Sequence, residues 1–145
     1  MRTKDFIGKL DHDRIVKTIR AEEARTSGQI RVYIQRGVLK TDPLAAAQTR
    51  FYKLGMEKTD RHNAVLIFVA PRAHKFAVIG DEGIHKACGD LLWQAVVEKM
   101  RDHFRSERFS EAIVGAIRDV GAVLAEHFPG TVDGSNKLPD EVIEG

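Results

Sequence analysis

The longest apolar run in the chain, Ala64–Ala70, constrains the fold more than any other sequence feature. At seven residues it is far shorter than the roughly 20 residues that cross a bilayer. A short, nearly continuous apolar segment is typical of a central strand that is covered on both faces. The sequence therefore predicts an α/β protein with helices on both sides of a sheet.

Two further segments predict the neighbours of this strand. Gln29–Arg36 alternates polar and apolar residues, which is the pattern of a half-buried strand. Lys75–Gly80 follows the turn Pro71–His74 and predicts an antiparallel hairpin with the apolar run. A helical segment separates the first two strands, as in a right-handed parallel crossover. We expect a three-layer α/β/α sandwich around a small mixed sheet, with two parallel strands and one antiparallel hairpin strand.

Capping residues and apolar spacing predict the helices. A helix is expected after Asp11, and a second after Thr41 or Asp42, with Pro43 in its first turn. The chain turns helical again from Gly83, and a last helix is expected to begin near Ser110. These elements fill residues 1–130, which we interpret as one domain.

Charge and composition exclude several classes of protein. The 145 residues carry a formal net charge of +2, with net −3 in residues 129–145 and therefore +5 in the rest. Residues 131–145 are interpreted as an acidic, loosely attached C-terminal tail. A modest positive charge without clustered Lys and Arg does not indicate nucleic-acid binding. The single cysteine, Cys88, excludes an intramolecular disulfide.

The N-terminal segment does not have the pattern of a targeting signal. Its apolar stretch is broken by Gly8 and Lys9, and no small-residue cleavage site follows. We expect a soluble, cytoplasmic monomer that does not bind a membrane.

The strand directions gather acidic side chains at one edge of the sheet. If the third strand is antiparallel, its end at Asp81 lies beside Asn63, and Asp60 and Glu23 belong to the same edge; Asp90 could reach it through a short helix. Converging carboxylates repel one another, and they either keep a proton or bind a hard cation through oxygen. Glu23, Asp60, Asp81 and Asp90 are therefore candidate metal ligands, with Asn63 in support.

Each of these residues also has a structural interpretation. Asp81 lies between two glycines that let a ligand approach, but it can equally cap the following helix. Glu23 can be a solvated glutamate at a helix end, Asn63 can cap the turn into its strand, and Asp60 can be ordinary surface. The residues alone leave both interpretations open.

Four sequence segments carry a resemblance to a known family. They are Ala21–Val32, Asn63–Ala70, Phe76–Ile84 and a long helical half that ends in Phe128-Pro129. In order and spacing, over residues 11–130, they resemble the TPM domain, named partly for a thylakoid-lumen acid phosphatase and a photosystem II repair protein. The resemblance implies a Rossmann-like α/β/α sandwich. It also implies calcium or magnesium binding in some members and phosphomonoester hydrolysis in a few.

The family's acidic and loop positions match Glu23, Asn63 and Asp81 in this sequence. Two functions follow as hypotheses. The first is a calcium- or magnesium-binding domain that acts in protein interaction or regulation, with an unknown protein partner. The second is a divalent-metal-dependent acid phosphatase, in which Asp81 is catalytic and a metal-bound water attacks a phosphomonoester. The first is favoured because no nucleophile and base can be paired in the sequence.

Overall fold

A computed structural model describes residues 2–89, 91–130 and 142–145 of the chain. Helices and strands alternate through the first half, and two long helices fill most of the second. In chain order the elements are α1 (Thr3–Gly8), α2 (His12–Glu23), β1 (Gln29–Ile34), α3 (Pro43–Lys53), the 3-10 turn η1 (Met56–Lys58), β2 (Ala64–Ala70), the 3-10 turn η2 (Pro71–Ala73), β3 (Lys75–Gly80), α4 (Glu82–Cys88), α5 (Leu91–Arg105), α6 (Phe109–His127) and β4 (Val142–Glu144).

The sheet has the strand order β3-β2-β1-β4. Strands β1 and β2 are parallel, with Gln29 opposite Ala64, and β3 is antiparallel to β2, with Gly80 opposite Val65. The parallel crossover and the hairpin predicted from the sequence are both confirmed. The fourth strand is a correction, because Val142–Glu144 pairs in parallel with β1 where the sequence predicted a loosely attached tail.

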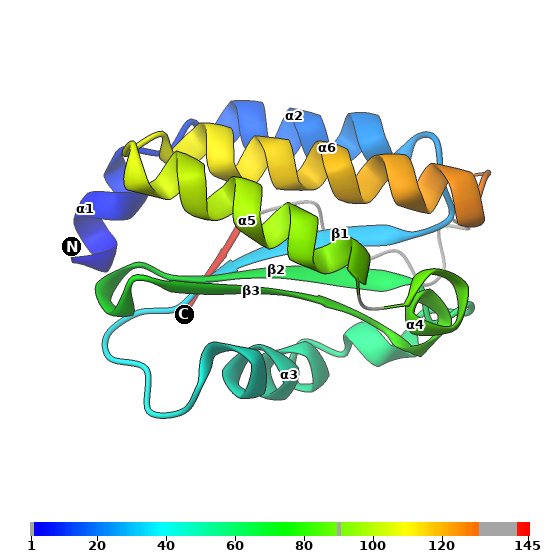
Figure 1. Ribbon diagram of the computed structural model, residues 1–145, viewed down its shortest axis with the longest axis horizontal. Coiled ribbons are helices and arrows are strands. Elements are labelled where there is room, and N and C mark those ends of the chain that lie inside the picture. Colours follow the sequence, from blue (N-terminus) through cyan, green and yellow to red (C-terminus); the bar gives the residue numbers. More distant parts are fainter. Residues whose placement is uncertain (1, 90, 131–141) are drawn as a thin grey trace.

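The sheet is the middle of three layers. Helices α2, α5 and α6 cover one face and α3 covers the other (Figure 1). Alternate residues of β2 enter the two cores: Val65, Ile67 and Val69 face the three-helix layer, and Leu66 and Phe68 face the α3 layer. All seven residues of β2 are buried, which explains the unbroken apolar run. The predicted α/β/α sandwich is confirmed.

The expected caps start their helices. Asp11 accepts a hydrogen bond from the backbone N–H of Arg14 at 3.1 Å, and Asp42 accepts one from Leu44 at 2.9 Å. Pro43 occupies the first turn of α3, as predicted. Among the described helices, none is long and apolar enough to cross a membrane.

Candidate functional site

Asp81 directly follows β3 and caps α4, which is one of the two roles that the sequence left open for it. Its Oδ1 accepts a hydrogen bond from the backbone N–H of Glu82 at 2.7 Å, and its side chain is 9% exposed. The second carboxylate oxygen, Oδ2, is buried and has no hydrogen-bond partner in the described part of the chain. Nδ1 of His62 lies 3.4 Å from Oδ2, in ion-pair range, and the His62 side chain is 53% exposed.

Asn63 lies beside Asp81 and ties the start of β2 to the start of β1. The side-chain amide donates to Oγ of Ser27 at 3.2 Å, and the backbone carbonyl accepts from the N–H of Gln29 at 3.3 Å. The N–H of Asp81 in turn donates to the carbonyl of Ala64, the residue after Asn63, at 2.9 Å. The topology therefore brings Asn63 and Asp81 together, as the strand directions predicted.

Gly83 has a packing role in this arrangement. Its N–H donates to the carbonyl of His62 at 2.9 Å, and a Cβ built on it would meet the carbonyl oxygens of Arg61 and His62. Only glycine lets the first turn of α4 approach the turn before β2 so closely. That approach holds His62 next to the Asp81 carboxylate.

Glu23 is buried, and its carboxylate serves a different strand edge. Its Oε2 accepts the backbone N–H of Ile30 at 2.9 Å, so it is not a solvated helix-end residue. The N–H of Gln29 faces β2, and successive residues of a strand face opposite neighbours, so the N–H of Ile30 faces away from β2. Among the described residues β4 pairs only with Val32–Ile34, so Glu23 lies at the outer edge of β1 ahead of that pairing.

The four predicted metal ligands are not all brought to one point. Asp81 directly follows β3, which is two strand spacings, about 10 Å, from β1. Glu23 lies on the far side of β1. Asp60 is exposed in the turn before β2. Asp90 lies outside the described residues. Across residues 2–89, 91–130 and 142–145, no three His, Cys, Asp or Glu side chains form a group that could hold a metal ion.

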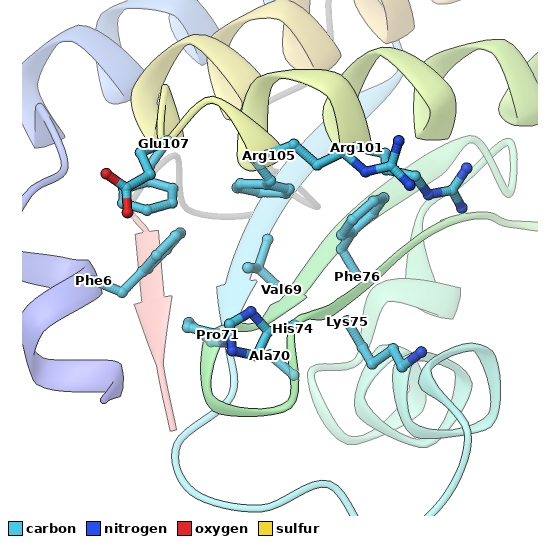
Figure 2. Close-up of a pocket in the computed structure, with 12 residues that line it drawn as sticks. Phe6, Val69, Ala70, Pro71, His74, Lys75, Phe76, Arg101, Arg105 and Glu107 are labelled. Atoms are coloured by element: carbon cyan, nitrogen blue, oxygen red, sulfur yellow. The ribbon is translucent and has the colours of Figure 1, made fainter. Parts of the chain in front are cut away.

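A cavity at the opposite end of the sheet was not predicted from the sequence. It measures about 470 Å³ and opens where the β2–β3 hairpin meets α1, α5 and the start of α6 (Figure 2). Its floor includes Val69 of β2 and four phenylalanines contributed by α1, β3, α5 and α6; they are Phe6, Phe76, Phe104 and Phe109.

The phenylalanines form one continuous aromatic surface. Ring centroids are 4.9 Å apart for Phe6 and Phe109, 6.2 Å for Phe109 and Phe104, and 5.1 Å for Phe104 and Phe76. The cavity could have been suspected on one ground, namely that ligands of open α/β sheets bind beyond the carboxyl ends of the parallel strands. The sequence prediction favoured the other edge because the carboxylates lie there.

Known proteins with this architecture place the chain in a family. The TPM domain model matches residues 2–123. The NMR structure of the BA42 protein from the psychrophilic bacterium Bizionia argentinensis is 32% identical, with a TM-score of 0.83 and 92% of each chain covered.

Two more distant structures share the fold. The N-terminal domain of the cg2496 protein from Corynebacterium glutamicum is 16% identical, with a TM-score of 0.63 and coverage of 91% of this chain and 82% of that one. An N-terminal domain from P. gingivalis is 20% identical, with a TM-score of 0.58 and coverage of 79% and 75%. No curated protein matches the chain. The family match covers most of the sequence, and the chain therefore belongs to the TPM domain family.

Proposed function

We propose that this TPM domain binds a calcium or magnesium ion at the Asp81 edge and acts through that binding in protein interaction or regulation. The observation that carries the proposal is the buried Oδ2 of Asp81, which accepts no hydrogen bond in the described part of the chain. Apart from the half-exposed His62 ring at 3.4 Å, this buried oxygen has no partner among the described residues, and a buried carboxylate oxygen so poorly satisfied is costly. A hard cation satisfies such an oxygen and prefers oxygen ligands.

The donor set near Asp81 is compatible with a weakly held cation. Asp81 supplies one carboxylate oxygen, and water and nearby backbone carbonyls are ordinary ligands of calcium and magnesium. Glu23 is committed to the N–H of Ile30 and is not required. A bound cation would neutralise the Asp81 charge that His62 now faces at 3.4 Å.

Hydrolysis is a second candidate because of the His62–Asp81 pair. A half-exposed histidine held by a buried carboxylate can act as a general base toward water. Binding is favoured over turnover because, within the described residues, the His62 ring contacts the Asp81 carboxylate and forms no hydrogen bond with a hydroxyl or thiol. A phosphatase would therefore rely on water as the nucleophile.

The test is a titration of the protein with calcium and then magnesium, followed by backbone amide shifts. We expect saturable shifts confined to the residues around Asn63 and Gly80–Gly83. The Asp81→Asn variant keeps a capping side chain and should weaken binding by about tenfold or more. The exposed Asp102→Asn variant on α5 is the matched control and should bind like the wild type.

Equal binding by the Asp81→Asn variant, or shifts spread over the whole surface, would overturn the cation site. Hydrolysis of a chromogenic phosphomonoester is measured on the same samples. Metal binding without turnover supports the binding function. Turnover by the wild type that is lost in both the Asp81→Asn and the His62→Gln variants would overturn the binding function in favour of phosphatase activity.

A further inference from the structure

We propose that the cavity between the β2–β3 hairpin and α5 is a second site, which binds a small organic anion. The ligand has an aromatic or short aliphatic body and one carboxylate or phosphate head group. The β2–β3 turn, which lines this cavity, lies at the opposite end of the sheet from α4, which Asp81 caps (Figure 1). The site therefore does not depend on the proposed cation.

The floor of the cavity selects the body of the ligand. Phe6 and Phe109 are buried, whereas Phe76 and Phe104 are half-buried and leave part of their rings accessible. Figure 2 shows Val69 between Phe6 and Phe76, with the hairpin turn closing the other side. An apolar group about the size of a fused pair of rings fits a cavity of about 470 Å³, which is within the usual range for ligand sites.

The rim of the cavity selects the charge of the head group. Arg101 and Arg105 lie on α5, and Lys75 lies on β3; all three are exposed and line the cavity. Among the described residues, none of the three has an ion-pair partner within 4.0 Å. Unneutralised cations above an apolar floor favour an anion, and arginine is suited to carboxylate and phosphate groups.

The arrangement also orients the ligand. The guanidinium of Arg101 lies 6.0 Å from the centroid of the Phe76 ring, so charge and aromatic surface meet at that end. The one acidic residue of the lining, Glu107, lies at the Phe6 end (Figure 2). The head group therefore faces Arg101 and Arg105, and the apolar body extends across Val69 toward Phe6.

The test uses three probes with one aromatic body: 2-naphthoate, 2-naphthyl phosphate and the uncharged 2-naphthalenemethanol. Binding is followed by amide shifts and by calorimetry. We expect saturable binding of at least one of the two anions, shifts at Val69–Phe76 and Arg101–Glu107, and clearly weaker binding of the alcohol. The better of the two anions identifies the head group.

Variants separate this site from general electrostatic attraction. The Arg101→Gln/Arg105→Gln variant should weaken the anion by about tenfold. Lys53→Gln/Lys99→Gln removes the same charge outside the cavity, from α3 and from α5, and should leave binding unchanged. Phe76→Leu should weaken all three probes.

Three results would each overturn the proposal. They are the absence of saturable binding by either anion, equal losses in the two charge variants, and shifts that map away from the cavity. Because the substituted arginines are exposed, the double variant is expected to fold, and the amide spectrum of each free variant verifies this.

Discussion

Glu23 illustrates how one side chain can complete a sheet without belonging to a strand. The residue ends α2, yet its carboxylate accepts the N–H of Ile30 at the part of β1 that β4 does not reach. A backbone donor buried there would otherwise lack a partner, at a cost of about 1–3 kcal/mol. Glu23 therefore has a structural role in this chain.

The Glu23→Ala variant is expected to lower the free energy of unfolding by about 1–3 kcal/mol, because it leaves the Ile30 N–H without its acceptor. Glu23→Gln retains an acceptor oxygen and should cost less. Urea unfolding of both variants measures the difference. Equal losses in the two variants would show that the negative charge, rather than the hydrogen bond, is what matters.

Cys88 gives a second prediction at this scale. Burial raises the pKa of its thiol above the ordinary value, with a smaller contribution from the negative charge of Glu126. The thiolate is the reactive form, so alkylation at pH 8 should be slower for the folded protein than for the same protein in urea. The folded rate should rise at a higher pH than the unfolded rate. Coincident pH profiles would contradict the assignment.

Helices α2 and α6 pack closely because one position in α6 has no side chain. A Cβ built on Gly121 would lie 2.6 Å from Cγ and 2.7 Å from Cβ of Glu22. A Cβ on Gly115, in the same helix, would meet nothing within 4 Å beyond the backbone of its own helix, so this position provides a matched control. The two glycines separate the effect of crowding from that of helix propensity.

We expect Gly121→Ala to destabilise the protein by about 1–3 kcal/mol, because α2 must shift to make room. Gly115→Ala should instead stabilise it by about 0.5–1 kcal/mol, since alanine is the better helix former. Thermal and urea unfolding measure both. A stabilising Gly121→Ala would mean that the helix pair tolerates a wider separation.

The same two helices are joined by an ion pair between Arg14 and Glu111. The hydrogen bond from Arg14 holds the pKa of Glu111 below its ordinary value. Because folding lowers the pKa of this carboxyl, the ion pair stabilises the folded state fully at pH values above the unfolded pKa, which is near 4.5. This stabilisation is lost as the pH falls through the lower pKa of the folded state. Glu111→Gln should therefore differ from the wild type at pH 7 and converge with it in acid. A difference that persists unchanged at pH 3 would contradict this linkage.

At the scale of the whole molecule, the elements that could be predicted are those with a regular spacing of apolar residues or a recognisable capping residue. The seven apolar residues of β2 and the alternation in β1 identified the two strands, and Asp11 and Asp42 marked helix starts. The half-burial that the alternation predicted for β1 is wrong, because all six of its residues are buried. These features are local, so they can be recognised without knowing what each element packs against. The antiparallel hairpin then placed Asp81 beside Asn63.

The features that the sequence did not predict depend on contacts between segments that are far apart in the chain. Strand β4 has three residues and follows an acidic segment with no strand periodicity, so only its pairing with β1 defines it. In the sequence, Phe104 is one member of a helical apolar stripe, and its part in a cavity becomes visible only beside Phe6 and Phe76. Glu23 lies away from Asp81 for a similar reason, because the edge of β1 whose N–H it accepts exists only in the folded sheet.

The fourth strand therefore provides a test of the molecule as a whole. Deletion of residues 142–145 removes the parallel partner of Val32–Ile34, including the N–H of Gly145 that donates to the carbonyl of Ile34 at 3.0 Å. It also uncovers the edge of β1, and unpaired edges favour association with other chains. We expect a loss of about 1–3 kcal/mol in stability and a concentration-dependent increase in size by sedimentation.

A substitution separates this backbone effect from the charge at the same place. Glu144→Gln breaks the surface ion pair with Arg36, whose charged atoms are 3.4 Å apart, and leaves the strand intact. Exposed pairs of this kind contribute about 0–1 kcal/mol, so the variant should unfold almost like the wild type and stay the same size. If the deletion variant also matched the wild type in stability and in size, β4 would contribute nothing to the sheet. The outer edge of β1 would then be protected by Glu23 and other parts of the chain.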